Sequence, residues 1–173
     1  MIDRPVTGHE IILSSHDTIQ SRTDNRGVIT FANPTFARIS GYSREELVGS
    51  PHNIVRHPNM PRGVYYALWQ IIQAGEEFFG FVNNRCKNGD NYWVFTRVDS
   101  HYNSEGDIDA YSSVRIMPKR EAVASWSKVY DRIVAIEQAQ PRDKQVAAGY
   151  QALLKHIRKS GAKNLTELAM RDV

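Results

Sequence analysis

Short stretches rich in β-branched and aromatic residues, several with alternating apolar and polar positions, predict β-strands before residue 32 and after residue 77. The first two stretches flank the turn signal Asn25-Arg26-Gly27, so we expect them to pair as a hairpin. Lys87-Asn88-Gly89-Asp90 is a second hairpin signal, and residues 103–107 form another turn. The expected strands are Thr18–Asp24, Val28–Phe31, Phe78–Cys86, Asn91–Tyr102 and Ile108–Met117.

Between the second and third of these strands, cap and stop signals predict helices. Asn33-Pro34 provides an N-cap followed by a proline in the first turn, and Ser43 forms a capping box with Glu46. The longest of these helices is amphipathic, with apolar residues at helical spacing. The expected helices run from Pro34 to a stop at Gly41, from Ser43 to a stop at Gly49, and from Pro61 to Ala74.

The last part of the chain changes to a purely helical pattern. A first apolar stripe in residues 119–140 consists of Val123, Trp126, Val129 or Tyr130, Ile133 and Ile136. Pro141 ends that helix, and residues 141–160 carry a second stripe of Val146, Tyr150, Leu153, Leu154 and Ile157. A short third helix is expected over Leu165–Met170. These patterns predict a helical hairpin appended to the preceding strands and helices.

The order of elements predicts an α+β fold, in which a five-stranded antiparallel sheet carries short helices on one face. We divide the chain into an N-terminal cap (residues 1–17), an α+β domain (18–118) and a C-terminal helical extension (119–173). Two antiparallel helices with an apolar face can pack on the sheet or against a second copy of the chain. We therefore expect the extension to serve output or dimerisation.

Composition narrows the classes of function. The chain has 173 residues, 41% of them hydrophobic, and a formal net charge of +3 without a block of like charge, which argues against nucleic-acid binding. The one cysteine, Cys86, excludes an internal disulfide framework and a cysteine-rich metal site. No apolar run approaches the ~18–20 residues of a membrane span. We expect a soluble cytoplasmic protein.

The element order and the turn Asn88-Gly89-Asp90-Asn91-Tyr92-Trp93-Val94 resemble the PAS sensory domain. Residues 36–42, 49–53 and the segment Val55-Arg56-His57-Pro58-Asn59-Met60-Pro61 look like the PAS domain of bacterial aerotaxis receptors. The resemblance covers residues 18–118 and implies a PAS fold that binds FAD non-covalently. It further implies a homodimer that reports redox or oxygen state to a chemotaxis-type receptor or kinase signalling protein.

The resemblance also implies a set of cofactor-binding residues. A guanidinium suits phosphate, an indole can pack against the flavin ring, and a carboxamide can face the ring's polar edge as donor and acceptor. A carboxamide could also flip when the ring takes up a proton and so pass the signal to the sheet. The aerotaxis receptors usually carry Asp where this chain has Asn59. The implied residues are Asn33, Arg56, His57, Asn59, Trp69 and Asn84.

Other interpretations stay open from the sequence. Trp69 can be a core aromatic, Asn84 a strand-edge amide, and the segment before Pro58 a rigid turn. His52 or His57 could ligate the iron of haem b, which would make the protein a gas sensor of the same fold. A cofactor-free protein-interaction module is the remaining alternative. No nucleophile, phosphate-loop or metalloprotease motif is visible, so we expect no enzyme.

Overall fold

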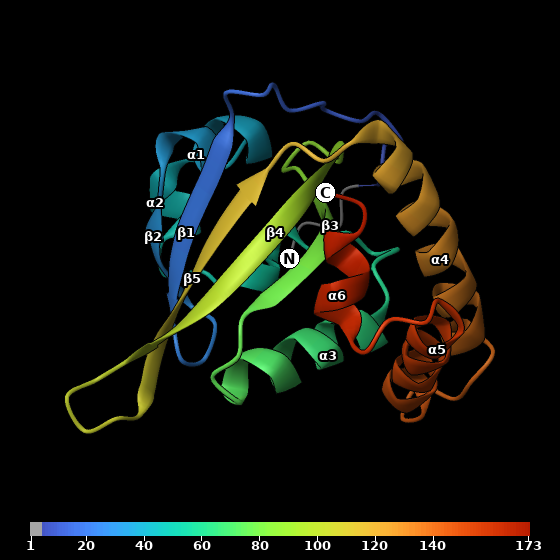
Figure 1. Ribbon diagram of the computed structural model, residues 1–173. Coiled ribbons are helices and arrows are strands. Elements are labelled where there is room, and N and C mark those ends of the chain that lie inside the picture. The colour runs from blue at the N-terminus through green and yellow to red at the C-terminus, as the bar shows by residue number, and fades with distance from the viewer. Residues whose placement is uncertain (1–4) are drawn as a thin grey trace.

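A central antiparallel sheet organises the protein, whose computed structural model describes residues 5–173. The sheet has five strands in the order β2-β1-β5-β4-β3, as Figure 1 shows. The chain forms β1 (Thr18–Asp24), β2 (Ile29–Ala32), α1 (Pro34–Ser40), α2 (Arg44–Leu47), the 3₁₀ helix η1 (His52–Val55), α3 (Arg62–Gln73), β3 (Phe78–Arg85), β4 (Asn91–Tyr102), β5 (Ile108–Ile116), α4 (Arg120–Gln138), α5 (Gln145–Lys159) and α6 (Leu165–Met170). The predicted α+β fold with a C-terminal helical region is confirmed.

Local signals in the sequence act as expected at the first hairpin. The Asp24 carboxylate accepts the backbone N–H groups of Arg26 and Val28, both at 2.9 Å, and so holds the turn closed. Gly27 adopts a φ of +83°, which a residue with a side chain would tolerate poorly. Strand β2 therefore leaves this turn antiparallel to β1, with Phe31 opposite Arg22.

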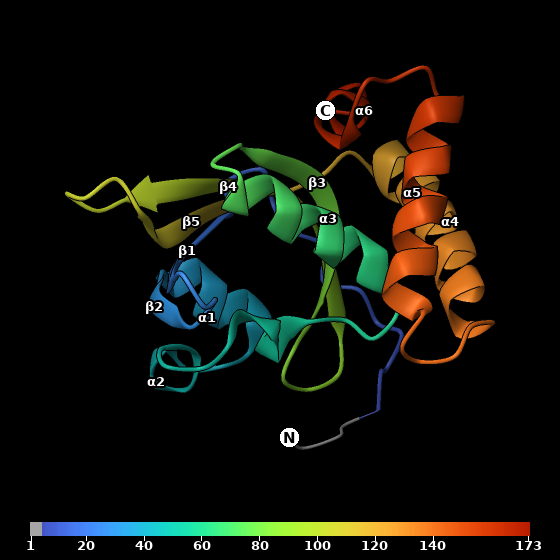
Figure 2. The same ribbon diagram turned by 90° about the horizontal axis from the view of Figure 1, so that it is seen from below.

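Helices α1, α2, η1 and α3 cover one face of the sheet, whereas the helical extension lies at the β3 edge (Figure 2). The Asn33 side chain accepts the Phe36 N–H and caps α1, and Ser43 forms the expected capping box at α2. The turn η1, which the sequence patterns did not predict, shapes the chain between α2 and α3. Helix α5 begins at Gln145, later than predicted, because residues 141–144 form a turn.

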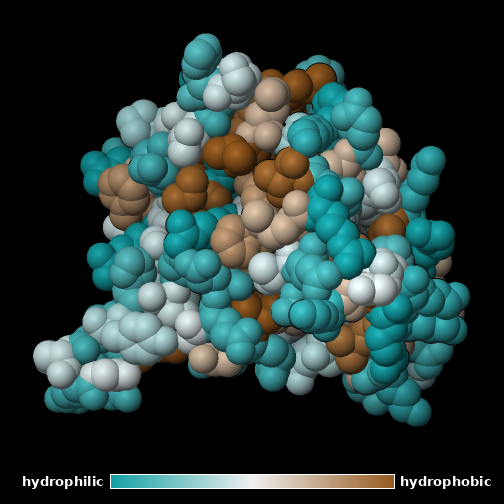
Figure 3. Space-filling view, in the orientation of Figure 1, coloured by the Kyte–Doolittle hydropathy of each residue, from teal (hydrophilic) through white to brown (hydrophobic). Residues whose placement is uncertain are grey.

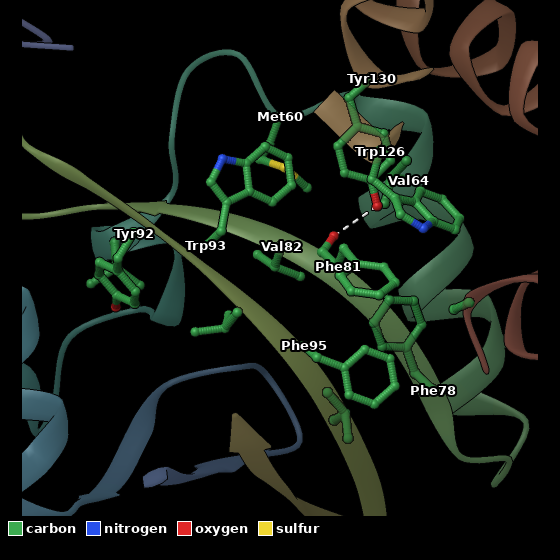
Figure 4. Packing of buried hydrophobic residues seen from close by; sticks show 14 of the residues in the cluster. Met60, Val64, Phe78, Phe81, Val82, Tyr92, Trp93, Phe95, Trp126 and Tyr130 are labelled. Atoms are coloured by element: carbon green, nitrogen blue, oxygen red, sulfur yellow. Dashed lines mark hydrogen bonds between the residues drawn. The ribbon is translucent and has the colours of Figure 1, made fainter. Parts of the chain in front are cut away.

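The opposite, outer face of the sheet is covered near β3 by aromatic side chains of α4. Trp126 stacks on Phe81 with ring centroids 5.4 Å apart, and Tyr130 stacks on Trp93 at 6.0 Å. The Tyr130 hydroxyl donates to the Phe81 carbonyl at 2.7 Å, the dashed line in Figure 4. Burial of several aromatic rings fixes α4 to the sheet, since each fully buried ring contributes on the order of 2–3 kcal/mol.

One position of the predicted α4 stripe is wrong. Ile136 is 45% exposed, and the next residue, Glu137, is buried with 4% of its surface accessible. The next buried position after Ile133 is therefore four residues on, at Glu137, and not three residues on, at Ile136. Both spacings keep a side chain on the same face of a helix. A carboxylate replaces an aliphatic side chain there because it accepts hydrogen bonds from α3, as described below.

The N-terminal segment runs beside the β3–β4 turn. The Thr7 N–H donates to the Gly89 carbonyl at 3.0 Å, and the Ile11 N–H donates to the Asn91 carbonyl at 2.7 Å. Glu10 receives two bonds from the Arg120 guanidinium, at 2.7 and 2.8 Å, which tie the segment to the start of α4. Residues 1–4 of the predicted cap lie outside the described residues.

The outer face also presents apolar surface away from α4. Val114 and Ile116 of β5 are 36% and 42% exposed, and Figure 3 shows apolar side chains gathered over the middle of this face. Across residues 5–173, the helices are too short or too polar for any of them to cross a bilayer.

Candidate functional site

A cavity of about 240 Å³ lies between the sheet and α3, with the segment around η1 closing one side. Its apolar wall comes from one face of α3, where Tyr65, Leu68, Trp69 and Ile72 recur at helical spacing. Sites for small molecules commonly measure ~300–1,000 Å³, so this cavity can enclose the ring of a larger ligand while the remainder stays at the mouth. The mouth is formed by exposed residues, Arg26, Pro51 and Asn53.

The indole of Trp69 stands near the mouth. Its ring meets that of Tyr111 from β5 edge to face, with centroids 5.6 Å apart. A Cβ atom at Gly27 would lie 3.3 Å from the Trp69 ring, so the β1–β2 turn packs directly on the indole. The Trp69 and Tyr111 rings thus border a flat apolar slot between α3 and the sheet.

Arg115 of β5 supplies the most unusual group in the cavity wall. Only 2% of it is accessible, and its guanidinium lies over the Phe36 ring, 4.6 Å from the centroid. One nitrogen, Nη2, donates to the Ser21 hydroxyl, whereas Nε and Nη1 have no hydrogen-bond partner among residues 5–173. Burial lowers the pKa of the guanidinium to about 10. No carboxylate in this part of the chain forms an ion pair with it.

His52 in η1 completes a small network with Arg115. Its Nε2 lies 3.1 Å from the Ser21 hydroxyl, and its ring stacks on Phe36 with centroids 5.8 Å apart. Burial, reinforced by the nearby Arg115 cation, lowers the pKa of His52 to about 3. The imidazole is therefore neutral, and because Ser21 accepts from Arg115, its hydroxyl proton is available to donate to Nε2.

Two further polar groups of the wall have unused bonding capacity. The Asn84 Nδ2 amide and the Thr96 hydroxyl are buried and have no hydrogen-bond partner within the described chain. Together with Arg115 they make this part of the cavity rich in donors. Buried unpaired donors cost about 1–3 kcal/mol each. Such a wall suits a ligand whose edge carries hydrogen-bond acceptors or negative charge.

The structure brings Arg56, Trp69 and Asn84 together in the cavity lining. A backbone bridge joins Arg56 to Asn84, so the segment before α3 is anchored to β3 at this point. The Arg56 guanidinium lies over the Tyr65 ring, 4.1 Å from the centroid, and burial lowers its pKa.

The structure does not bring the other predicted residues into this lining. Asn33 caps α1, and its amide nitrogen donates to the Thr18 carbonyl at 2.8 Å. His57 is buried, with a pKa lowered by burial, and its Nδ1 accepts the Asn59 N–H at 3.2 Å. Asn59 lines a second cavity of about 100 Å³ beside β3, β4 and α4.

Three residues of the cavity lining were not predicted from the sequence: Arg115, Thr96 and Ser21. A usable signal existed for Arg115, since residues 111, 113 and 115 lie on one face of a strand that was itself predicted. An arginine on the buried face of a strand is rare enough to mark a site. Ser21 and Thr96 carry no such signal, because small hydroxyl residues are common in strands.

The PAS fold family matches residues 29–115 of the chain. The aerotaxis receptor of Escherichia coli is 40% identical over 130 residues, which cover 75% of this chain and 26% of that receptor. The nitrogen fixation regulatory protein of Klebsiella pneumoniae is 30% identical over 95 residues, or 55% of this chain and 19% of that protein. This chain thus spans about a quarter or less of these relatives.

Among solved structures, a light-oxygen-voltage domain studied with a flavin analogue superposes with a TM-score of 0.58. That match covers 64% of this chain and 84% of the other, at 18% sequence identity. At such low identity the likeness concerns the fold.

Proposed function

The chain belongs to the PAS family, and on that premise we propose that it is a sensor module that binds FAD in the cavity beside α3. It would pass redox or oxygen state to a signalling partner. The observation that carries the proposal is the set of unpaired buried donors on Arg115, Asn84 and Thr96. The pyrimidine edge of a flavin ring offers carbonyl oxygens and ring nitrogens that these donors can satisfy.

The shape and charge of the cavity support the same ligand. The slot lined by Trp69 and Leu68 is apolar, as the flat flavin ring requires. FAD is larger than the cavity, so its phosphates would lie toward the mouth. Arg56 and Arg26, both in the lining, provide the positive charge for them.

Bound FAD would supply reversible electron transfer at its ring. The residues of this chain would bind and orient the ring and report its state. The carboxamide of Asn84 is suited to reporting because its Nδ2 is buried and has no hydrogen-bond partner among the described residues. Asn84 belongs to β3, so a rotation would act directly on the strand that carries α4 on its other face.

Similarity to the aerotaxis receptor supports a chemotaxis-type receptor or kinase as the partner. We place the module in the cytoplasm and propose that it forms a homodimer through the apolar outer face around Val114 and Ile116. We propose no enzymatic role. Light scattering of the purified protein at several concentrations would test the dimer, and a monomer at all of them would refute it.

Haem b is the second candidate, because His52 lines the cavity as a neutral imidazole. Its Nε2, however, already lies within hydrogen-bonding distance of the Ser21 hydroxyl, and Arg115 is better suited to an acceptor-rich ring than to a metal site.

Absorption spectroscopy of the purified protein tests the proposal. We expect flavin bands and a released cofactor that co-elutes with FAD rather than FMN. A Soret absorption band that disappears in His52→Ala would show that the cofactor is haem b and not FAD. A colourless protein that takes up no FAD on reconstitution would refute flavin binding and favour a cofactor-free interaction module.

A further inference from the structure

Helix α3, which forms the apolar wall of the cavity, has no cap from its own sequence. Its N-cap residue is Pro61, which offers no side-chain hydrogen bond. The first turn is buried around Gly63, so water does not reach all of its N–H groups. Unpaired N–H groups at a buried helix end are costly, and another part of the molecule must satisfy them.

Glu137, near the end of α4, provides that cap. Its carboxylate accepts the Gly63 N–H at 2.8 Å and the Arg62 N–H at 3.0 Å, across 74 and 75 residues of sequence. A carboxylate at a helix N-terminus is favoured by the helix dipole and by charge-assisted bonds. The buried charge is thus compensated by backbone groups of α3.

Two glycines make room for this contact. A Cβ atom at Gly149 of α5 would lie 1.9 Å from the Glu137 carboxylate, and one at Gly63 would lie 2.2 Å from the Tyr150 nitrogen. Helix α5 therefore crosses α3 at backbone contact, with the carboxylate between them. Beside this crossing, the Tyr66 and Tyr150 rings meet edge to face at 5.0 Å. Figure 2 shows the beginning of α3 lying against α5.

The same helix thus faces the extension and the cavity. Tyr66 and Gly63 contact α5, whereas Tyr65 and Trp69 line the cavity. The charge of Glu137 also acts on Arg56, which lies in the cavity wall just before α3. A change at either surface of α3 is transmitted by a rigid helix rather than by a flexible linker.

We propose that Glu137 is a positioning residue of the cavity, and that through it docking of the α4–α5 hairpin and ligand binding are thermodynamically linked. The proposal rests on the proposed function in taking FAD as the ligand. A docked hairpin holds α3 where Trp69 and Tyr65 form the slot, and an occupied slot holds the α3 end where Glu137 can cap it. By linkage, each event changes the equilibrium of the other by the same factor.

Hydrogen exchange and FAD titration on the full chain test this proposal, with Glu137→Gln as the main variant. Glutamine keeps the shape of glutamate but can accept with only one oxygen and carries no charge. Glu121→Gln, on the exposed side of the same helix, is the matched control. In the natural sequence we expect FAD to slow exchange in α4 and α5 as well as in α3.

In Glu137→Gln we expect faster exchange in residues 120–159, loss of their protection by FAD, and an FAD Kd raised roughly fivefold or more. Glu121→Gln should behave as the natural sequence does. Faster hairpin exchange in Glu137→Gln with an unchanged Kd would overturn the proposal, since Glu137 would then be a structural cap only. Gly149→Ala, which pushes the carboxylate from its place, should reproduce the effects of Glu137→Gln.

The two proposals fail in distinguishable ways. If the natural sequence takes up no FAD, the proposed function is refuted, and the exchange of the ligand-free protein decides the positioning role. Glu137→Gln should then speed exchange in the cavity-lining part of α3, residues 64–72, together with the hairpin. An increase in the exchange rate that is confined to α4 and α5 would contradict the positioning role of Glu137.

Discussion

Replacing Arg115 by Met should strengthen the ligand-free fold and weaken FAD binding at the same time. Methionine has a similar length, fills the space over Phe36 and carries no donors. In the ligand-free protein the Arg115 charge is buried with Nε and Nη1 unpaired within the described chain. With FAD bound, we expect the same two groups to hold the acceptor edge of the ring. The two effects therefore have opposite signs.

The size of the stability effect follows from the pKa of the guanidinium. It falls from 12.5 to about 10 on burial. At about 1.4 kcal/mol per pKa unit, the buried charge costs roughly 3 kcal/mol. Loss of the Ser21 hydrogen bond and the Phe36 ring contact offsets part of this gain. We expect a net stabilisation of about 1–2 kcal/mol, or roughly 3–6 °C in Tm for a chain of this length.

The size of the binding effect follows from the two unpaired donors. Each hydrogen bond from a charged group contributes about 1.5 kcal/mol at the lower end of the usual range. Loss of both should cost roughly 3 kcal/mol, which corresponds to about 100-fold in Kd.

Thermal unfolding of the flavin-stripped proteins and FAD titration by fluorescence quenching measure the two effects separately. Arg22→Met is the matched control, because Arg22 is an exposed arginine one position from Ser21 on β1. It should leave both quantities near those of the natural sequence. A ligand-free Arg115→Met protein with a lower Tm, or one with an FAD Kd within twofold of the natural value, would refute the reasoning.

Three further predictions concern the cavity. Asn84→Asp, which exchanges the unpaired donor for an acceptor, should raise the FAD Kd by about tenfold or more in the same titration, whereas Asn83→Asp on the outer face should not. Trp69→Leu should raise the Kd about tenfold, because the apolar volume stays but the flat ring that meets Tyr111 is lost; an unchanged Kd would remove its assigned role. Folding lowers the pKa of His52 from 6.5 to about 3. Between these two pH values the unfolded chain binds a proton at His52 that the folded chain does not, so the unfolding free energy should fall as the pH drops from 6.5 to about 3. Urea unfolding of His52→Asn between these pH values should show a shallower decline, and an equal slope would mean that the imidazole is not held neutral.

The strands and helices were predictable because their signals are local. Turn residues such as Gly27, and caps such as Asn33 and Ser43, act within a few residues of themselves. The boundaries of α5 and the existence of η1 were not predicted, because both depend on how the chain packs after it folds. Here tertiary contacts outweigh weak local propensity.

The cavity was predictable only in part. Arg56, Trp69 and Asn84 were identified through family resemblance, and the structure places them in one lining. Arg115 was missed because its role depends on strand pairing: β5 lies between β1 and β4, and this places the guanidinium beside Ser21. Alternation along β5 could mark Arg115 as an unusual buried arginine, but its partner Ser21 follows only from the long-range pairing of β5 with β1.

The two buried charges illustrate different ways in which one fold can tolerate an ion. Glu137 is compensated within the chain, since the N–H groups of Arg62 and Gly63 and the α3 dipole offset the loss of water. Arg115 is compensated only in part, by Ser21 and the face of Phe36. Breaking the first should therefore destabilise the protein under all conditions. Removing the Arg115 charge should destabilise only the liganded state. The Nε and Nη1 groups of Arg115 find a hydrogen-bond partner only when an acceptor enters the cavity. A folded protein that keeps such a costly group in a cavity wall gains from it only on binding, and this is the physical reason to look for a ligand there.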